Sequence, residues 1–139
     1  MNYWLMKTEP ETYSWDMLVK QKSGTWDGVR NYAARNNLKA MKKGDLVFIY
    51  HSNSPKAVIG IAKVVAEAFP DPTTKDPAWV AVKVTAQEKL PRPVTLDEMK
   101  LVRSLSKMKL LKIGRLSVSP VSAGEWQTIL KLAKHAPKS

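Results

Sequence analysis

Hydrophobic positions in the first part of the chain follow first a strand spacing and then a helix spacing. Residues 3–7 form a short aromatic and aliphatic run that stops at the turn-prone Thr8-Glu9-Pro10, which predicts a buried first strand. Ser14 is a good helix cap, and the apolar residues 15, 18 and 19 share one helical face, so a short helix is expected up to Ser23-Gly24. A second helix is expected over residues 31–41, before Lys42-Lys43-Gly44.

Strand spacing dominates the middle of the chain. Three apolar segments rich in branched residues, 46–50, 58–69 and 79–85, predict three successive strands with a loop at 52–55. Pro91 and Pro93 are expected to end this run, because proline cannot continue a central strand.

The last third of the chain carries two helix-start signals. Thr95 with Glu98 and Ser122 with Glu125 have the spacing of capping boxes, and residues 116–118 between them predict one more strand. The predicted order is β, α, α, β, β, β, α, β, α. It indicates one α+β domain over residues 1–135, built on a curved, mostly antiparallel sheet or small barrel flanked by helices, with 136–139 as a frayed tail.

The charge of the chain points to a polyanionic partner. Lys and Arg number 23 and Asp and Glu 12, which gives a net charge of +11, and acidic residues are absent from 28–44 and 99–124. Positive charge gathered in such segments favours nucleic acid as the partner. The alternative is that the basic surface serves only solubility. The first residues contain Lys7 and Glu9 and lack a long apolar run, so neither a signal peptide nor a membrane span is expected. We therefore expect a cytoplasmic location.

Several catalytic classes lack their residues. The chain has no cysteine, which excludes cysteine nucleophiles and thiolate metal sites, and it has neither of the glycine-rich nucleotide-phosphate motifs. His51 and His135 have no carboxylate at ligand spacing, and no serine-hydrolase elbow occurs. We therefore expect no metal, no cofactor and no catalytic residues of these types.

The aromatic residues suggest a binding site. Trp4, Trp15 and Trp126 occupy core positions of predicted elements, whereas Trp26 is expected in a loop between two helices, followed by Arg30, Asn31 and Tyr32. An indole, a guanidinium, an amide and a phenol can together stack on a base, pair with a phosphate and read a base edge. The alternative is that Trp26 plugs the helix junction and Asn31 only caps a helix.

Five blocks of the sequence resemble the EVE domains, small proteins of bacteria and eukaryotes. The blocks are Tyr3-Trp-Leu-Met-Lys-Thr-Glu-Pro10, Trp26-Asp-Gly-Val-Arg-Asn-Tyr-Ala-Ala-Arg-Asn36, Lys43-Gly-Asp-Leu-Val-Phe-Ile-Tyr-His-Ser-Asn53, Gly60-Ile-Ala with Phe69-Pro-Asp-Pro72, and Arg115-Leu-Ser-Val-Ser-Pro-Val121. The resemblance implies a PUA-like fold, a small mixed β-barrel flanked by helices, similar to YTH domains that read methylated adenine in RNA. It further implies binding of a modified base of DNA or RNA in an aromatic pocket.

On this hypothesis the chain is a binding module for a modified nucleobase. The residues expected to form the base pocket are Trp26, Asn31, Tyr32, His51, Ser52 and Asn53, and those expected to hold phosphates are Lys7, Arg30, Arg35 and Arg115.

Two alternatives stay open at this point. The PUA-like group also includes ASCH-type amidohydrolases that act on modified cytidines through Lys, Thr and Glu, residue types that Lys7-Thr8-Glu9 supplies. Because consecutive strand residues alternate faces, Lys7 and Glu9 are expected to share a side and Thr8 to point away. The other alternative is a protein-interaction adaptor with a basic surface.

Overall fold

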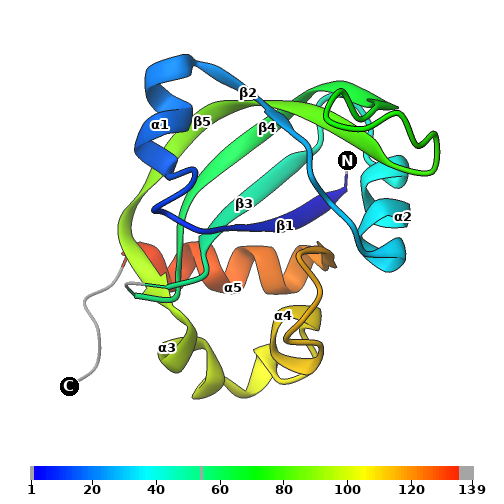
Figure 1. The fold of residues 1–139 in the computed structure, drawn as a ribbon. Helices are drawn as coiled ribbons and strands as arrows, with labels where there is room; N and C mark the ends of the chain where they lie inside the picture. Colours follow the sequence, from blue (N-terminus) through cyan, green and yellow to red (C-terminus); the bar gives the residue numbers. More distant parts are fainter. Residues whose placement is uncertain (1, 54, 135–139) are drawn as a thin grey trace.

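One mixed sheet organises the fold, as seen in a computed structural model that describes residues 2–53 and 55–134 (Figure 1). The strands are β1 (Tyr3–Thr8), β2 (Ser23–Trp26), β3 (Leu46–His51), β4 (Ala57–Pro70), β5 (Val80–Thr95) and β6 (Val118–Val121). The helices are α1 (Trp15–Gln21), α2 (Tyr32–Ala40), α3 (Leu96–Lys100), the 3-10 turn η1 (Arg103–Leu105), α4 (Lys109–Lys112) and α5 (Ala123–Lys134). The predicted tail, 136–139, lies outside the described residues.

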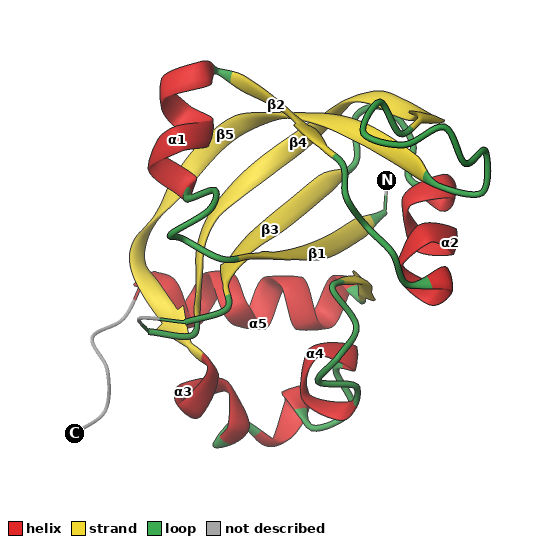
Figure 2. Cartoon of the chain, viewed as in Figure 1, coloured by secondary structure: helices red, strands yellow, loops and turns green. Residues whose placement is uncertain are grey.

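The strands are arranged in the order β2-β5-β4-β3-β1-β6. β1 runs parallel to β3, and the other neighbouring pairs are antiparallel. The long β4–β5 hairpin has several register shifts, and the sheet curls so that β2 crosses the side opposite α5 (Figure 2). The predicted α+β class with a curved, mostly antiparallel sheet is confirmed.

Each face of the sheet buries its own apolar cluster, because successive strand residues point to opposite faces. In β1, Trp4 and Met6 join a cluster with α1 and α2, whereas Leu5 joins the cluster beneath α5. Trp126 of α5 anchors the second cluster by stacking on Phe48, with ring centroids 3.7 Å apart. The helices therefore lie on both sides of the sheet, with α5, α3 and α4 on one side (Figure 1).

The helix starts predicted at Ser14 and Ser122 are confirmed by the hydrogen bonds of their caps. The Ser14 hydroxyl accepts from the Met17 backbone N–H at 3.1 Å. Ser122 and Glu125 form a complete capping box, in which each side chain accepts from the backbone N–H of the other at 3.1 and 3.0 Å. The core positions of Trp4, Trp15 and Trp126 are also confirmed.

The prediction that Trp26 lies in a loop between two helices is wrong. Trp26 is the last residue of β2, which pairs antiparallel with β5 and places Trp26 beside Val82. This strand is too short to show an alternating pattern, and it contains Gly24, which sequence reasoning treats as a helix stop. Glycine is needed there because a Cβ would lie 2.3 Å from the Tyr13 hydroxyl.

The prediction that Pro91 and Pro93 end the sheet is also wrong, because β5 continues to Thr95. In the ladder with β4, Lys89 pairs with Gly60 and Val94 pairs with Val58, so residues 90–93 bulge opposite a single residue. The prolines thus sit where no ladder bond is required of them. β6 also begins at Val118 rather than at residue 116, and the short turns η1 and α4 were not predicted.

Candidate functional site

A pocket of about 470 Å³ opens where the ends of β1 and β2 meet the segment that precedes β6. Three parts of the chain contribute: β1 with the turn after it, β2 with the loop after it, and Ser117. The lining residues are Lys7, Thr8, Glu9, Thr12, Tyr13, Thr25, Trp26, Asp27, Gly28, Val29, Arg30 and Ser117. Its volume is that of a small-molecule or single-base site.

Two aromatic residues, Tyr13 and Trp26, line the pocket. Trp26 is only 8% exposed and belongs to the core cluster under α1 and α2, while also lining the pocket. Tyr13 meets it edge to face, with centroids 5.6 Å apart and planes at 83°. The Tyr13 hydroxyl donates to Gln21 Oε1 at 2.8 Å, and burial raises the pKa of Tyr13. The pair gives the pocket an aromatic part of its lining.

Lys7 joins the pocket to the segment before β6. Its ammonium donates to the Gly114 carbonyl at 2.7 Å, and its backbone N–H donates to the Ser117 carbonyl at 2.9 Å. Burial, with a smaller contribution from Lys56, lowers the pKa of Lys7. One backbone carbonyl leaves the ammonium with donors to spare, so Lys7 can bind a ligand without breaking its structural bond.

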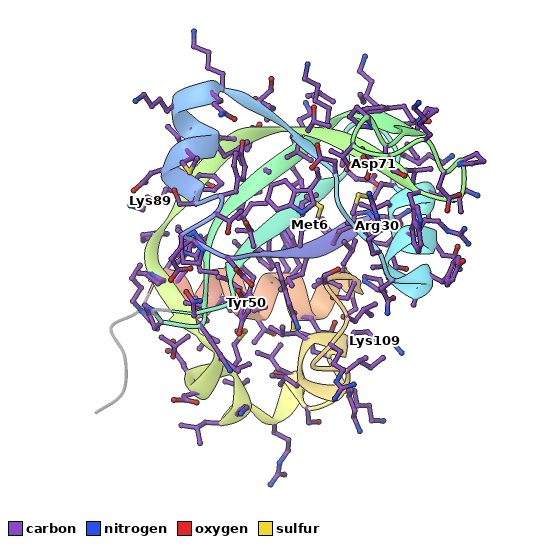
Figure 3. All side chains as sticks on the ribbon, viewed as in Figure 1. Met6, Arg30, Tyr50, Asp71, Lys89 and Lys109 are labelled. Carbon is purple, nitrogen blue, oxygen red and sulfur yellow. The ribbon has the colours of Figure 1, made fainter. Side chains whose placement is uncertain are left out.

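A buried carboxylate fixes the opposite wall. Asp71 is 2% exposed and accepts from Gly28 N and Arg30 Nη1, both at 2.9 Å, and from Thr73 N and Oγ1 at 2.7 and 2.6 Å. Burial alone would raise the pKa of Asp71, but the bonds from Thr73, Arg30 and Gly28 outweigh it and hold that pKa well below its ordinary value. Figure 3 shows Arg30 and Asp71 next to one another. The positive φ of Gly28, 76°, aims its N–H at this carboxylate.

Outside the pocket, a row of aromatic and cationic side chains joins α2 to the loop between β4 and β5. Tyr32 stacks on Trp79 with centroids 4.9 Å apart, Arg30 lies 5.5 Å from the Trp79 ring, and Arg35 lies 4.9 Å from the Tyr32 ring. Arg35 also donates to the Ala78 carbonyl at 3.1 Å. Tyr32 is 62% exposed, so the row lies at the surface.

The residues at the end of β3 have internal partners. His51 Nε2 accepts from the Trp15 backbone N–H at 3.1 Å, and burial lowers the pKa of His51 against smaller opposing effects of Asp16 and Glu11. Ser52 donates to the Thr8 carbonyl through both its backbone N–H and its hydroxyl. The Asn53 amide faces the Glu11 carboxylate.

Of the residues predicted for the site, Trp26, Lys7 and Arg30 meet at the pocket. The structure places the others outside its lining. Asn31 caps α2 by accepting from Ala34 N at 2.9 Å, and Arg115 is exposed shortly before Ser117. The remaining residues outside the lining are Tyr32, Arg35, His51, Ser52 and Asn53.

Lys7, Thr8 and Glu9 all belong to the pocket lining. The Thr8 hydroxyl donates to the Tyr13 carbonyl at 2.6 Å. Sequence reasoning missed Tyr13 and Asp71, because both reach the site only through tertiary contacts. Because residues 28–44 contain no Asp or Glu, a carboxylate partner of Arg30 had to come from another part of the chain.

Two further properties bear on function. No helix in the described ranges, 2–53 and 55–134, is long and apolar enough to cross a membrane. The same residues contain no group of three or more His, Asp or Glu side chains placed to hold a metal ion.

The comparison with known families is decisive for classification. A model of the family described as EVE domain matches residues 2–132. The chain belongs to the EVE domain family. Mouse thymocyte nuclear protein 1 is 38% identical over 98% of this chain and 75% of its own length.

Solved structures agree in fold with this EVE domain. The protein Atu2648 of Agrobacterium tumefaciens is 42% identical with a TM-score of 0.94, over 100% of this chain and 99% of its own. Human THYN1 protein, solved in complex with 5-methylcytosine-containing DNA, is 33% identical with a TM-score of 0.91, over 99% of this chain and 100% of its own. An ASCH protein of Zymomonas mobilis, at 16% identity and a TM-score of 0.59 over 94% of this chain and 95% of its own, shares the fold alone.

Proposed function

We propose that this EVE domain binds nucleic acid that carries a modified base, with 5-methylcytosine in DNA as the first ligand to test, and that the base enters the pocket between β1 and β2. The observation that carries the proposal is the match in fold, over nearly the whole chain, to the human protein solved with 5-methylcytosine-containing DNA. The net charge of +11 supports a polyanionic partner.

The pocket supports a base rather than a larger ligand. A volume of about 470 Å³ accommodates one pyrimidine with room for solvent, and the Tyr13–Trp26 pair gives the base an aromatic surface. Stacking of one base on an aromatic side chain contributes about 1–3 kcal/mol, and extruding a base from a duplex costs a few kcal/mol. Edge contacts and phosphate contacts must therefore supply much of the affinity.

Lys7 is the cation best placed to provide such contacts, since its described partner is a carbonyl and not a carboxylate. Arg30 is paired with Asp71 and is a weaker candidate for a phosphate. Arg35 and Arg115 lie outside the lining and would contact flanking phosphates. Binding should weaken with salt, by about 0.7 log units of affinity per log unit of salt for each phosphate held on a single strand.

The test compares single-stranded oligonucleotides of identical sequence with 5-methylcytosine or cytosine at one central position. Fluorescence anisotropy at two salt concentrations should give tighter binding to the methylated oligonucleotide, by about 5- to 150-fold, because one methyl group in an apolar site contributes about 1–3 kcal/mol. Parallel RNA oligonucleotides decide which polymer is preferred.

A pocket-filling variant and a matched control locate the binding. Thr12 is an exposed residue of the pocket lining, and Gln127 is an exposed residue of α5 on the other side of the sheet. Thr12→Trp should remove the preference for the methylated base, whereas Gln127→Trp should keep it. Equal affinity of the wild-type protein for methylated and unmethylated oligonucleotides would end the proposal.

One observation favours a second candidate function, hydrolysis of a modified cytidine. Lys7, Thr8 and Glu9, the residue types of such an amidohydrolase site, all line the pocket. The Thr8 proton is donated to the Tyr13 carbonyl, however, so Thr8 is not hydrogen-bonded to Lys7 as a nucleophile to its base. Incubation with N4-acetylcytidine tests this function: release of cytidine that is lost in Lys7→Met would support it.

A further inference from the structure

Two carboxylates line the pocket of this strongly basic chain. Glu9 and Asp27 are both exposed, and both belong to the lining. Across the described part of the chain, neither carboxylate accepts a hydrogen bond, and the ion pairs are Arg30–Asp71 and Arg92–Glu98. The two acids are therefore available to a ligand, unlike Asp71, whose oxygens hold the pocket wall.

Glu9 is held in a defined position beside Lys7. It directly follows β1, and its carbonyl accepts from the backbone N–H groups of Thr12 and Tyr13 at 3.0 and 2.8 Å, which fixes the turn. Both Lys7 and Glu9 line the pocket, yet they lie beyond ion-pair distance of one another. The pocket thus presents a hydrogen-bond donor and an acceptor that are not paired with one another.

This pair matches one type of base edge. Cytosine carries an exocyclic amino group, which donates, next to the ring nitrogen and carbonyl oxygen, which accept. A carboxylate facing the amino group forms a charge-assisted hydrogen bond, and an ammonium facing the acceptors forms another. Thymine carries the same 5-methyl group as 5-methylcytosine, but it presents a carbonyl oxygen in place of the amino group and an N–H in place of the ring acceptor. In the same pose the carboxylate would face the carbonyl oxygen, which it repels, and the ammonium would face the N–H.

We propose that Glu9 is the specificity-determining residue of the pocket, and that it accepts from the exocyclic amino group of a cytosine-type base while Lys7 donates to the acceptors of the same edge. This inference rests on the proposed function and goes beyond it, since it assigns the choice between amino and carbonyl bases to one side chain. Glu88 in β5 is exposed and lies outside the pocket lining, so Glu88→Gln serves as the matched control for the loss of one negative charge by the same chemical change.

The experiment measures binding of three single-stranded DNA oligonucleotides that differ only at one base: 5-methylcytosine, cytosine or thymine. Single strands are used because a thymine opposite guanine in a duplex is mismatched and opens more easily. Wild-type protein should bind the 5-methylcytosine strand about tenfold or more tightly than the thymine strand. Glu9→Gln should reduce this ratio to within about threefold, because an amide can either accept or donate. Glu88→Gln should leave the ratio unchanged, and both variants should melt like the wild type.

The outcomes separate this inference from the function on which it rests. If the wild-type protein prefers 5-methylcytosine to cytosine but binds thymine equally well, the role of Glu9 is refuted and the modified-base function stands. Retention of the full ratio by Glu9→Gln, or its loss in Glu88→Gln, also overturns the role of Glu9. If no base is preferred over any other, the proposed function and this inference fail together.

Discussion

Replacing Asp71 by asparagine should both destabilise the fold and damage the pocket. The Asp71 carboxylate is nearly inaccessible and accepts four hydrogen bonds, two of them from the pocket-lining residues Gly28 and Arg30. An asparagine keeps one acceptor oxygen, but its NH₂ group must face donors, and the Arg30 charge loses its partner. Breaking a buried pair costs about 3–5 kcal/mol, and since the Arg30 side chain is 40% exposed we expect about 2–4 kcal/mol for Asp71→Asn.

The measurement is urea unfolding of wild type, Asp71→Asn and the control Asp76→Asn at pH 7. Asp76 lies in the same loop but is exposed, and among the described residues its carboxylate accepts from Ala78 N alone, so its substitution should cost less than about 1 kcal/mol. Because the pKa of Asp71 is lowered in the folded state, its stabilisation is complete above about pH 4 and is lost as the pH falls through the folded value. The gap between wild type and Asp71→Asn should therefore narrow below pH 4. An Asp71→Asn protein within about 0.5 kcal/mol of wild type at pH 7 would refute this reasoning.

Three further substitutions test the packing and backbone described above. Gly60→Ala should lower stability by about 1–3 kcal/mol in thermal melts, because the new Cβ would lie 2.7 Å from the Trp15 ring. The control Gly124→Ala in α5 has open space around the new Cβ and should raise stability by about 0.5–1 kcal/mol. Lys22 has a φ of 69°, so Lys22→Gly should stabilise by about 1 kcal/mol in urea unfolding, and a loss would show that this backbone is unstrained. Because the pKa of His51 is lowered by burial, stability should fall as the pH drops from 6.5 through the folded value, and melts of His51→Gln should lack this loss.

The sequence predicts the parts of this fold that local signals determine. The caps at Ser14 and Ser122 and the core tryptophans all depend on contacts within a few residues or on simple burial, and each is confirmed. Strand β2 could not be predicted in this way. Its four residues gain their structure from pairing with β5, about sixty residues later in the chain, and from the packing of Tyr13 on Gly24.

The pocket also depends on contacts between distant segments, which the sequence alone does not predict. Lys7, Trp26 and Arg30 were predicted because their residue types suggest binding chemistry, and the structure brings them together. Tyr13 has no local motif that sets it apart, and the block Phe69-Pro-Asp-Pro72 gives no local sign that Asp71 bonds to Gly28 and Arg30. Their roles follow from where the turn after β1 and the loop after β4 lie in the folded chain.

The segment 26–32 shows why residue type alone misassigns the base readers. In the structure the guanidinium and the amide of this segment already have structural roles, since Arg30 pairs with Asp71 and Asn31 caps α2. A side chain whose hydrogen-bonding groups are already satisfied gains little by contacting a ligand, because it must first give up its partner. Recognition should therefore fall to lining residues that keep unused hydrogen-bonding capacity, which directs mutagenesis of this EVE domain to Lys7 and Glu9 rather than to the aromatic segment.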